Sequence, residues 1–308
     1  MKLAHSIHLL VLAGLLQGCL SFHNGPIPDA PPSGKKDVGV THYVELEGSR
    51  IHYLEAGEGP AVVLIHGFAS SLDAWNTVIG PLAKHRRVIA LDLKGFGYSD
   101  RAPGDYSPAA QARIVNALME HVGAQTFEVV AHSWGASVAL KLALQEPEKV
   151  DKLALYDAWV YYEQLPTFFQ WARAPFLGDM MFALWYRERP QDKIAGAFYD
   201  PRYVTQELVD TVETDLAIPG VTAAALEAVR GQTYEDWQHQ YKTIEQPTLL
   251  LWGENDAVTR LEFGERLARD LPNAELVIYP QCGHFPMIEA AKQSTRDLLE
   301  FLLAPEAP

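Results

Sequence analysis

The sequence predicts an α/β protein with a mostly parallel, eight-stranded sheet, helices on both faces, and a helical cap inserted after the sixth strand. From residue 40 onward, short apolar runs alternate with segments of helical periodicity, which is typical of a parallel sheet covered on both faces. Between residues 159 and 241 the alternation stops, and no buried strand is found there. A helical insertion therefore interrupts the predicted sheet.

The expected strands are short runs rich in β-branched, leucine and aromatic residues. The first two form a hairpin, and most later runs are continuously apolar, as in strands buried on both faces. In chain order they are residues 41–47, 50–56, 61–66, 87–93, 127–132, 152–157, 248–253 and 275–280.

The clearest expected helix follows Ser107, a good N-cap residue, with Pro108 in the first helical position and Gly123 after its end. Further segments with helical patterns cover residues 72–84, 136–144 and 287–303.

The insertion is rich in aromatic side chains and contains Pro166, Pro175, Pro190 and Pro219. Because proline ends helices, we expect several short helices here. The aromatic residues could line an apolar acyl-binding pocket or only pack the cap against the core, and the sequence favours neither. The predicted division is a core of residues 39–158 and 242–308 with a cap of residues 159–241.

The bulk composition is that of a folded globular protein. The 308 residues are 48% hydrophobic and 21% charged, which suits one large domain. The formal net charge of -14 gives no general attraction to nucleic acid or to anionic lipid, so no nucleic-acid partner is expected.

The N-terminus is typical of an export signal. Lys2 precedes an apolar run over residues 9–16, which is too short to span a bilayer and suits a signal peptide. Residues 16–19, Leu-Gln-Gly-Cys, resemble a bacterial lipoprotein box. In that family the cysteine, here Cys19, is lipidated and becomes the first mature residue, although Gln17 is unusual at its position.

Residues 1–19 are therefore expected to be a signal peptide with a lipobox, followed by a tether rich in proline and glycine over residues 20–38. This predicts an exported lipoprotein, anchored to the membrane on the periplasmic or outer face of a bacterial envelope. Ordinary export and an uncleaved anchor are the alternatives. A lipidated Cys19 would leave Cys282 as an unpaired thiol.

The first chemical motif is Ala131-His132-Ser133-Trp134-Gly135, between a buried strand and a helix of small residues. This is the context of a nucleophile elbow, a tight turn that holds a serine in strained backbone geometry and needs small neighbours. A serine that only caps the helix is the alternative, and the context favours the elbow.

The second motif is His66-Gly67-Phe68, which follows another buried strand. An oxyanion needs two backbone N–H donors placed in advance, and Phe68 and Trp134 would supply them. The side chain of His66 is expected to be structural.

Two late strands are followed by Asp256 and His284. The chain order Ser133, Asp256, His284 is that of nucleophile, acid and base, because serine needs a base and the base needs an orienting carboxylate. Asp157 also follows a strand and is the alternative acid. The rival bases are His132, His121 and His239, none of which follows the last strand.

Together these motifs resemble the capped, serine-dependent α/β-hydrolase family, over roughly residues 40–303. Residues 92–99, Asp-Leu-Lys-Gly-Phe-Gly-Tyr-Ser, are similar to that family's loop after its fourth strand. The resemblance implies the α/β-hydrolase fold. Ala131 departs from it, since glycine is commoner there, and some relatives take their acid from the position of Asp157.

Capped hydrolases that open epoxides or displace halide use an aspartate nucleophile, so Ser133 favours acyl transfer. The predicted enzyme cleaves small-molecule carboxylic esters with small to medium hydrophobic acyl groups, through an acyl-enzyme. It is expected to need no cofactor and no metal, because the sequence has no Cys/His cluster with ligand spacing.

The alternatives are a carbon–carbon bond hydrolase or an aminopeptidase of the same fold, and a non-catalytic binding protein. Residues 67–70, Gly-Phe-Ala-Ser, depart from the Gly-Gly-Pro-Gly stretch of relatives that cleave amino-terminal proline.

Overall fold

The structure is a computed structural model that describes residues 26–28, 38–186 and 190–305. The predicted signal peptide, its Cys19 and most of the predicted tether lie outside the described residues. Across the described ranges, no helix has both the length and the apolarity that a membrane crossing requires.

In the described part of the chain, eight strands form one sheet in the order β1-β2-β4-β3-β5-β6-β7-β8. β2 pairs antiparallel with β1 and with β4, and every other pairing is parallel. The predicted eight-stranded, mostly parallel sheet is thus confirmed. The strands are β1 Val40–Leu46, β2 Ser49–Ala56, β3 Ala61–Ile65, β4 Arg87–Leu91, β5 Phe127–His132, β6 Val150–Tyr156, β7 Thr248–Gly253 and β8 Ala274–Tyr279.

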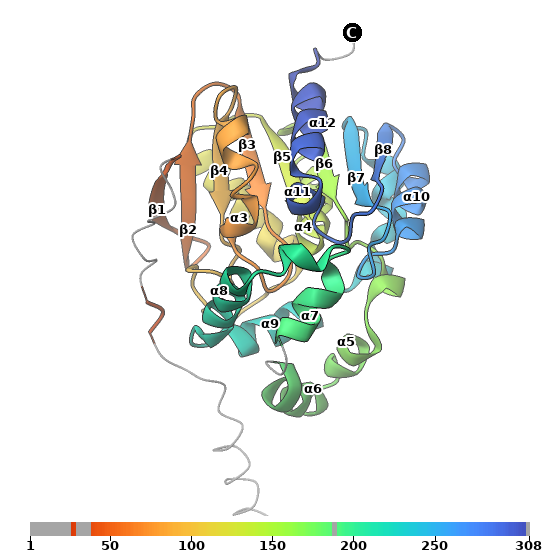
Figure 1. Cartoon of the computed structure of the whole chain (residues 1–308). Coiled ribbons are helices and arrows are strands. Elements are labelled where there is room, and N and C mark those ends of the chain that lie inside the picture. Colours follow the sequence, from red (N-terminus) through yellow and green to blue (C-terminus); the bar gives the residue numbers. More distant parts are fainter. Residues whose placement is uncertain (1–25, 29–37, 187–189, 306–308) are drawn as a thin grey trace, which may run out of the picture.

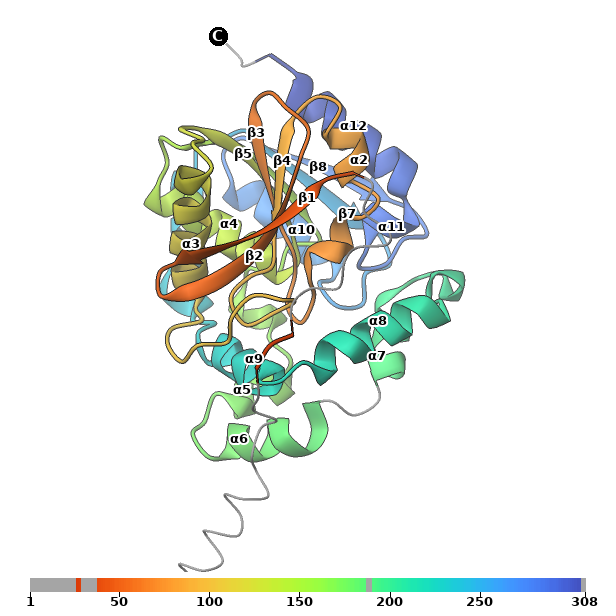
Figure 2. The ribbon, with the colours of Figure 1, turned by 90° about the vertical axis from the view of Figure 1, so that its left-hand side faces the viewer.

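Successive side chains of the parallel strands point into two separate hydrophobic layers, because side chains alternate across a sheet. Val63 and Ile65 of β3 belong to the layer that also holds α3, α4 and α10. Val62 and Leu64 belong to the layer of α2, α11 and α12. Figures 1 and 2 show these helices on the two faces of the sheet. They are α2 Ile79–Leu82, α3 Pro108–His121, α4 Trp134–Gln145, α10 Leu261–Asp270, α11 Pro286–Glu289 and α12 Ala291–Leu303.

The predicted start of α3 is found, since the Ser107 side chain accepts a hydrogen bond from the backbone of Ala110 and Pro108 opens the helix. Two expected helices are broken instead. Residues 72–84 form only a 3₁₀ turn and the short α2, which contains Gly80 and Pro81, both poor helix formers. The last helix is split into α11 and α12 at Ala290, whose backbone is not helical.

Helices also fill the chain between β6 and β7, and no strand occurs in its described residues. Figures 1 and 2 show these helices, hereafter the cap, gathered at one end of the sheet. They are α5 Thr167–Ala172, α6 Leu177–Met181, α7 Pro190–Ala197, α8 Gln206–Ala217 and α9 Val221–Arg230. The predicted insertion after the sixth strand is confirmed.

Candidate active site

Ser133 is the turn between β5 and α4, with the strained backbone angles φ 52° and ψ -122°. Both of its backbone polar groups are held: its N–H donates to the Tyr156 carbonyl at 2.9 Å, and its carbonyl accepts from the Trp159 N–H at 3.0 Å. A Cβ on Gly135 would lie 2.6 Å from the carbonyl oxygen of Ile65. The turn therefore needs a glycine at this position.

His284 lies in the loop after β8 and joins two other side chains. Its Nε2 lies 3.0 Å from Oγ of Ser133, and its Nδ1 lies 2.7 Å from Oδ2 of Asp256. All three residues are at most 5% exposed. With Nδ1–H donating to the carboxylate, Nε2 can accept the serine proton. These side chains come together because parallel strands present their carboxyl ends at one edge of a sheet.

The carboxylate of Asp256 is fixed by its own loop. Its Oδ1 accepts hydrogen bonds from the backbone N–H groups of Val258 and Thr259, at 2.6 and 3.0 Å. The Thr259 hydroxyl lies 2.6 Å from Oδ2. Burial alone would raise the pKa of Asp256, but the facing His284 and these hydrogen bonds outweigh it and hold the pKa below its ordinary range. Asp256 is thus ionised at neutral pH.

Asp157 stands beside this pair at the end of β6 and is completely buried. Its Oδ1 accepts a hydrogen bond from the Gly253 N–H at 2.9 Å, and it forms no hydrogen bond with His284. Burial and the neighbouring Asp256 raise the pKa of Asp157 well above its ordinary value. Asp157 therefore lacks the contact that Asp256 makes, and the geometry favours Asp256 over Asp157 as the partner of His284.

Asp157, Asp256 and His284 offer ligand atoms within 4.8 Å of one another, which makes them the one candidate cation cluster in the described ranges. The facing atoms of Asp256 and His284 already hydrogen-bond to each other. A cation there would have to displace that bond, so the donor set fits proton transfer better than metal binding.

The loop after β3 packs against Ser133. A Cβ on Gly67 would lie 3.0 Å from Cβ of Ser133. Within residues 38–186 and 190–305, the backbone N–H groups of Phe68 and Trp134 donate to no other backbone carbonyl, so both are free to bind an oxyanion.

His66 is structural: its Nδ1 contacts the Gly67 carbonyl at 2.7 Å, and its Nε2 accepts from a backbone N–H.

Aromatic rings of core and cap meet beside this loop. The ring of Phe68 lies 6.1 Å from that of Trp134 and 5.2 Å from that of Phe169 in α5. It also lies 6.3 Å from the ring of Tyr186, which stacks on Phe182. These contacts pack the cap onto the core directly over the elbow.

Sequence reasoning did not identify two residues that hold this site, Thr259 and Glu289. An aspartate that bonds the backbone two residues on is a turn signal, and Asp256 does so with Val258, but no local pattern marks Thr259 or Glu289. His132 is not a second base, since its Nε2 hydrogen-bonds the His284 carbonyl at 2.8 Å. Burial and the neighbouring His284 lower its pKa well below the ordinary value, so it stays neutral.

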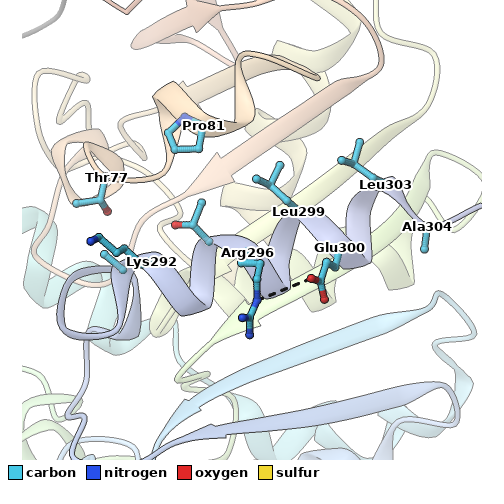
Figure 3. Close-up of a pocket in the computed structure, with 10 residues that line it drawn as sticks. Thr77, Pro81, Lys292, Arg296, Leu299, Glu300, Leu303 and Ala304 are labelled. Atoms are coloured by element: carbon cyan, nitrogen blue, oxygen red, sulfur yellow. Dashed lines mark ion pairs between the residues drawn. The ribbon is translucent and has the colours of Figure 1, made fainter.

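A surface hollow lies elsewhere, between α2 and α12, and none of its lining residues belongs to the site described above. Figure 3 shows Pro81 on one side and Leu299 on the other, with Arg296 and Glu300 paired at 3.7 Å along α12. The hollow is mostly apolar, and Ser133, Asp256 and His284 are not among its lining residues.

A family model described as "alpha/beta hydrolase fold" matches residues 60–291. An uncharacterized protein of Mycobacterium tuberculosis is 32% identical over 275 residues, covering 85% of this chain and 79% of that protein. A 2-hydroxy-6-oxononadienedioate/2-hydroxy-6-oxononatrienedioate hydrolase of Comamonas testosteroni is 30% identical over 269 residues, covering 83% and 92%. The structure of a thermophilic esterase from Thermogutta terrifontis superposes with a TM-score of 0.72 at 25% identity, covering 85% and 98%.

Proposed function

Because this chain belongs to the alpha/beta hydrolase family, we propose that it is a serine hydrolase with Ser133 as nucleophile, His284 as general base and Asp256 as acid. One observation carries the proposal. A continuous chain of hydrogen bonds runs from Ser133 Oγ through both ring nitrogens of His284 to Asp256. This series of hydrogen bonds starts at Ser133, whose backbone is strained, beside the unused backbone N–H groups of Phe68 and Trp134.

The geometry supports the following sequence of steps. Oγ of Ser133 attacks the substrate carbonyl carbon while its proton passes to Nε2 of His284, and Asp256 stabilises the imidazolium. The backbone N–H groups of Phe68 and Trp134 bind the oxyanion. Collapse transfers the proton from His284 to the leaving group, and the acyl group stays on Ser133. Water, activated by His284, then releases the acid and restores the serine.

For the substrate, we propose carboxylic esters with small to medium hydrophobic acyl groups. Aromatic rings over the elbow offer an apolar environment for an acyl chain. They are the rings of Phe68, Trp134, Phe169 and Tyr186. The protein of similar structure from Thermogutta terrifontis is an esterase, which supports an ester as the substrate.

A carbon–carbon bond hydrolase is the second candidate, and the 30% identity to the Comamonas enzyme over most of both chains favours it. The two candidates share the same side chains and differ in the bond that is broken. A panel of p-nitrophenyl esters set against a 2-hydroxy-6-oxo-dienoate separates them. Turnover of the dienoate alone would reject the ester proposal.

For its location, we propose export and lipidation at Cys19, with a membrane as partner on the periplasmic or outer face of a bacterial envelope. The support is the sequence of residues 1–19 alone.

The decisive experiment treats the protein with a fluorophosphonate and locates the adduct by mass spectrometry. We expect one adduct, on Ser133, and none in Ser133→Ala. Ser137→Ala is a matched control, since Ser137 lies one turn further along α4, where its hydroxyl donates to the Trp134 carbonyl and is not hydrogen-bonded to His284. The control should label at the wild-type rate. Wild-type protein without an adduct would reject the catalytic proposal and favour a binding protein with this fold.

A further inference from the structure

The loop that carries His284 is fastened to the cap by one carboxylate, that of Glu289 at the end of α11. Its Oε1 accepts from the Gly283 N–H at 2.8 Å. Its Oε2 accepts from the N–H groups of Tyr199 and Asp200 in the cap, both at 3.0 Å. Three backbone donors from two distant segments thus converge on one partly buried carboxylate. Bonds of this kind are stronger than those between neutral groups.

The backbone of His284 itself is held at both polar groups. Its N–H donates to the carbonyl of Ala197, the last residue of α7, at 2.7 Å. Its carbonyl accepts from Nε2 of His132, the residue before the nucleophile, at 2.8 Å. The position of the general base is therefore set by the cap on one side and by the elbow on the other.

The two segments pack without a gap. A Cβ on Gly283 would lie 2.5 Å from the carbonyl oxygen of Ala197 and 2.7 Å from the amide nitrogen of Tyr199. The ring of Phe198 stacks on that of Phe285 at 4.8 Å with 17° between the planes. Figure 2 shows α7 and α8 on the same side of the molecule as α11 and α12. This edge of the cap cannot shift without moving the loop of His284.

We propose that Glu289 is a positioning residue: by clamping the cap segment of Ala197 to Asp200 onto Gly283, it holds His284 in register with Ser133. The proposal rests on the proposed function, in which His284 is the base. It makes the α7 edge of the cap a fixed part of the catalytic machinery, so any opening of the cap for substrate occurs at another edge.

The test compares Glu289→Gln and Glu289→Ala with the wild type. Glutamine keeps the shape, but its NH₂ group cannot accept a hydrogen bond, so one side of the clamp is lost. Glu300→Gln is a matched control, because Glu300 is exposed on α12, where it pairs with Arg296 at 3.7 Å. Thermal melts of each variant define a temperature at which all are folded.

The first readout is the rate of labelling by a small and a bulky fluorophosphonate, together with kcat and KM for a small ester. A displaced base slows the chemical step whatever the size of the probe, and misplacement by about 1 Å costs up to about 100-fold. We expect both probes to slow equally in Glu289→Gln, between about 10- and 100-fold, with KM for the small ester within about twofold. An unchanged rate, or a loss with the bulky probe alone, would overturn the proposal.

The second readout does not depend on catalysis. Hydrogen exchange of the peptides around Ala197 to Asp200 and around Gly283 is measured in the wild type, Glu289→Gln and Glu300→Gln. Faster exchange in both segments of Glu289→Gln alone supports the clamp, and exchange at the wild-type rate overturns it. If wild-type protein forms no adduct, the proposed function fails, and exchange still decides whether Glu289 couples the two segments.

Discussion

Asp256→Asn should remove most of the catalytic activity, because it changes the hydrogen bond that Asp256 makes with His284. Oδ1 of Asp256 accepts two backbone N–H groups, from Val258 and Thr259. Only an oxygen can accept these bonds, so the new side chain must place its amide oxygen at this position. Its NH₂ group then takes the place of Oδ2, which lies 2.7 Å from Nδ1 of His284.

The magnitude follows from the tautomer of His284. An NH₂ group that faces Nδ1 makes that nitrogen an acceptor and puts the ring proton on Nε2. Nε2 can then no longer accept the proton of Ser133 Oγ at 3.0 Å. The same change in a serine protease lowers kcat by about 10⁴, so we expect a loss of about 10³ to 10⁴ here, or about 4 to 5.5 kcal/mol of barrier.

The assay measures the second-order rate of fluorophosphonate labelling and the turnover of a reactive ester. Asp157→Asn is the matched control, because Asp157 is buried beside Asp256 but forms no hydrogen bond with His284. This variant leaves the hydrogen bond between Asp256 and His284 in place, so its rate should stay within about tenfold of the wild type. A larger loss in Asp157→Asn than in Asp256→Asn would refute the assignment of the acid.

Three further predictions concern the fold and the membrane. Gly135→Ala should lower Tm and abolish labelling, because its Cβ would lie 2.6 Å from the Ile65 carbonyl oxygen; a folded, fully reactive variant would contradict the elbow geometry. Burial and the carboxylates of Asp92 and Asp73 raise the pKa of Asp215 to about 7. The unfolded chain loses this proton at lower pH than the folded chain, so the carboxyl makes stability fall as pH rises from about 4 to about 7. Asp215→Asn should remove this fall of Tm between about pH 4 and pH 7. A variant with the same slope of Tm against pH as the wild type would contradict the raised pKa of Asp215. Cys19→Ser should move the protein from the membrane fraction to the soluble fraction; an unchanged membrane fraction would refute lipidation.

The fold could be predicted because the sheet is mostly parallel. Strands buried on both faces, such as β3 and β7, are continuous apolar runs, and helical patterns separate several of the strands from the next. The helices were harder to predict. α10 was missed, since half of its ten residues are charged and only Phe263, Gly264 and Leu267 are buried. The helix expected over residues 72–84 fails at Gly80 and Pro81, where local propensity outweighed the apolar pattern.

The sequence by itself determined the order of the strands along the chain and the residues that follow each strand. It therefore determined which side chains gather at one edge of the sheet. Ser133, Asp157, Asp256 and His284 all follow parallel strands, whose carboxyl ends share that edge. Only the tertiary structure decided which carboxylate meets His284. It also decided that Glu289 holds the loop of His284 through Tyr199 and Asp200 of the cap, which lie 90 and 89 positions before Glu289 in the chain. The physical reason is one of scale: hydrogen bonds require alignment within a few tenths of an ångström. That alignment is set by the packing of separate segments, which no local pattern of residues encodes.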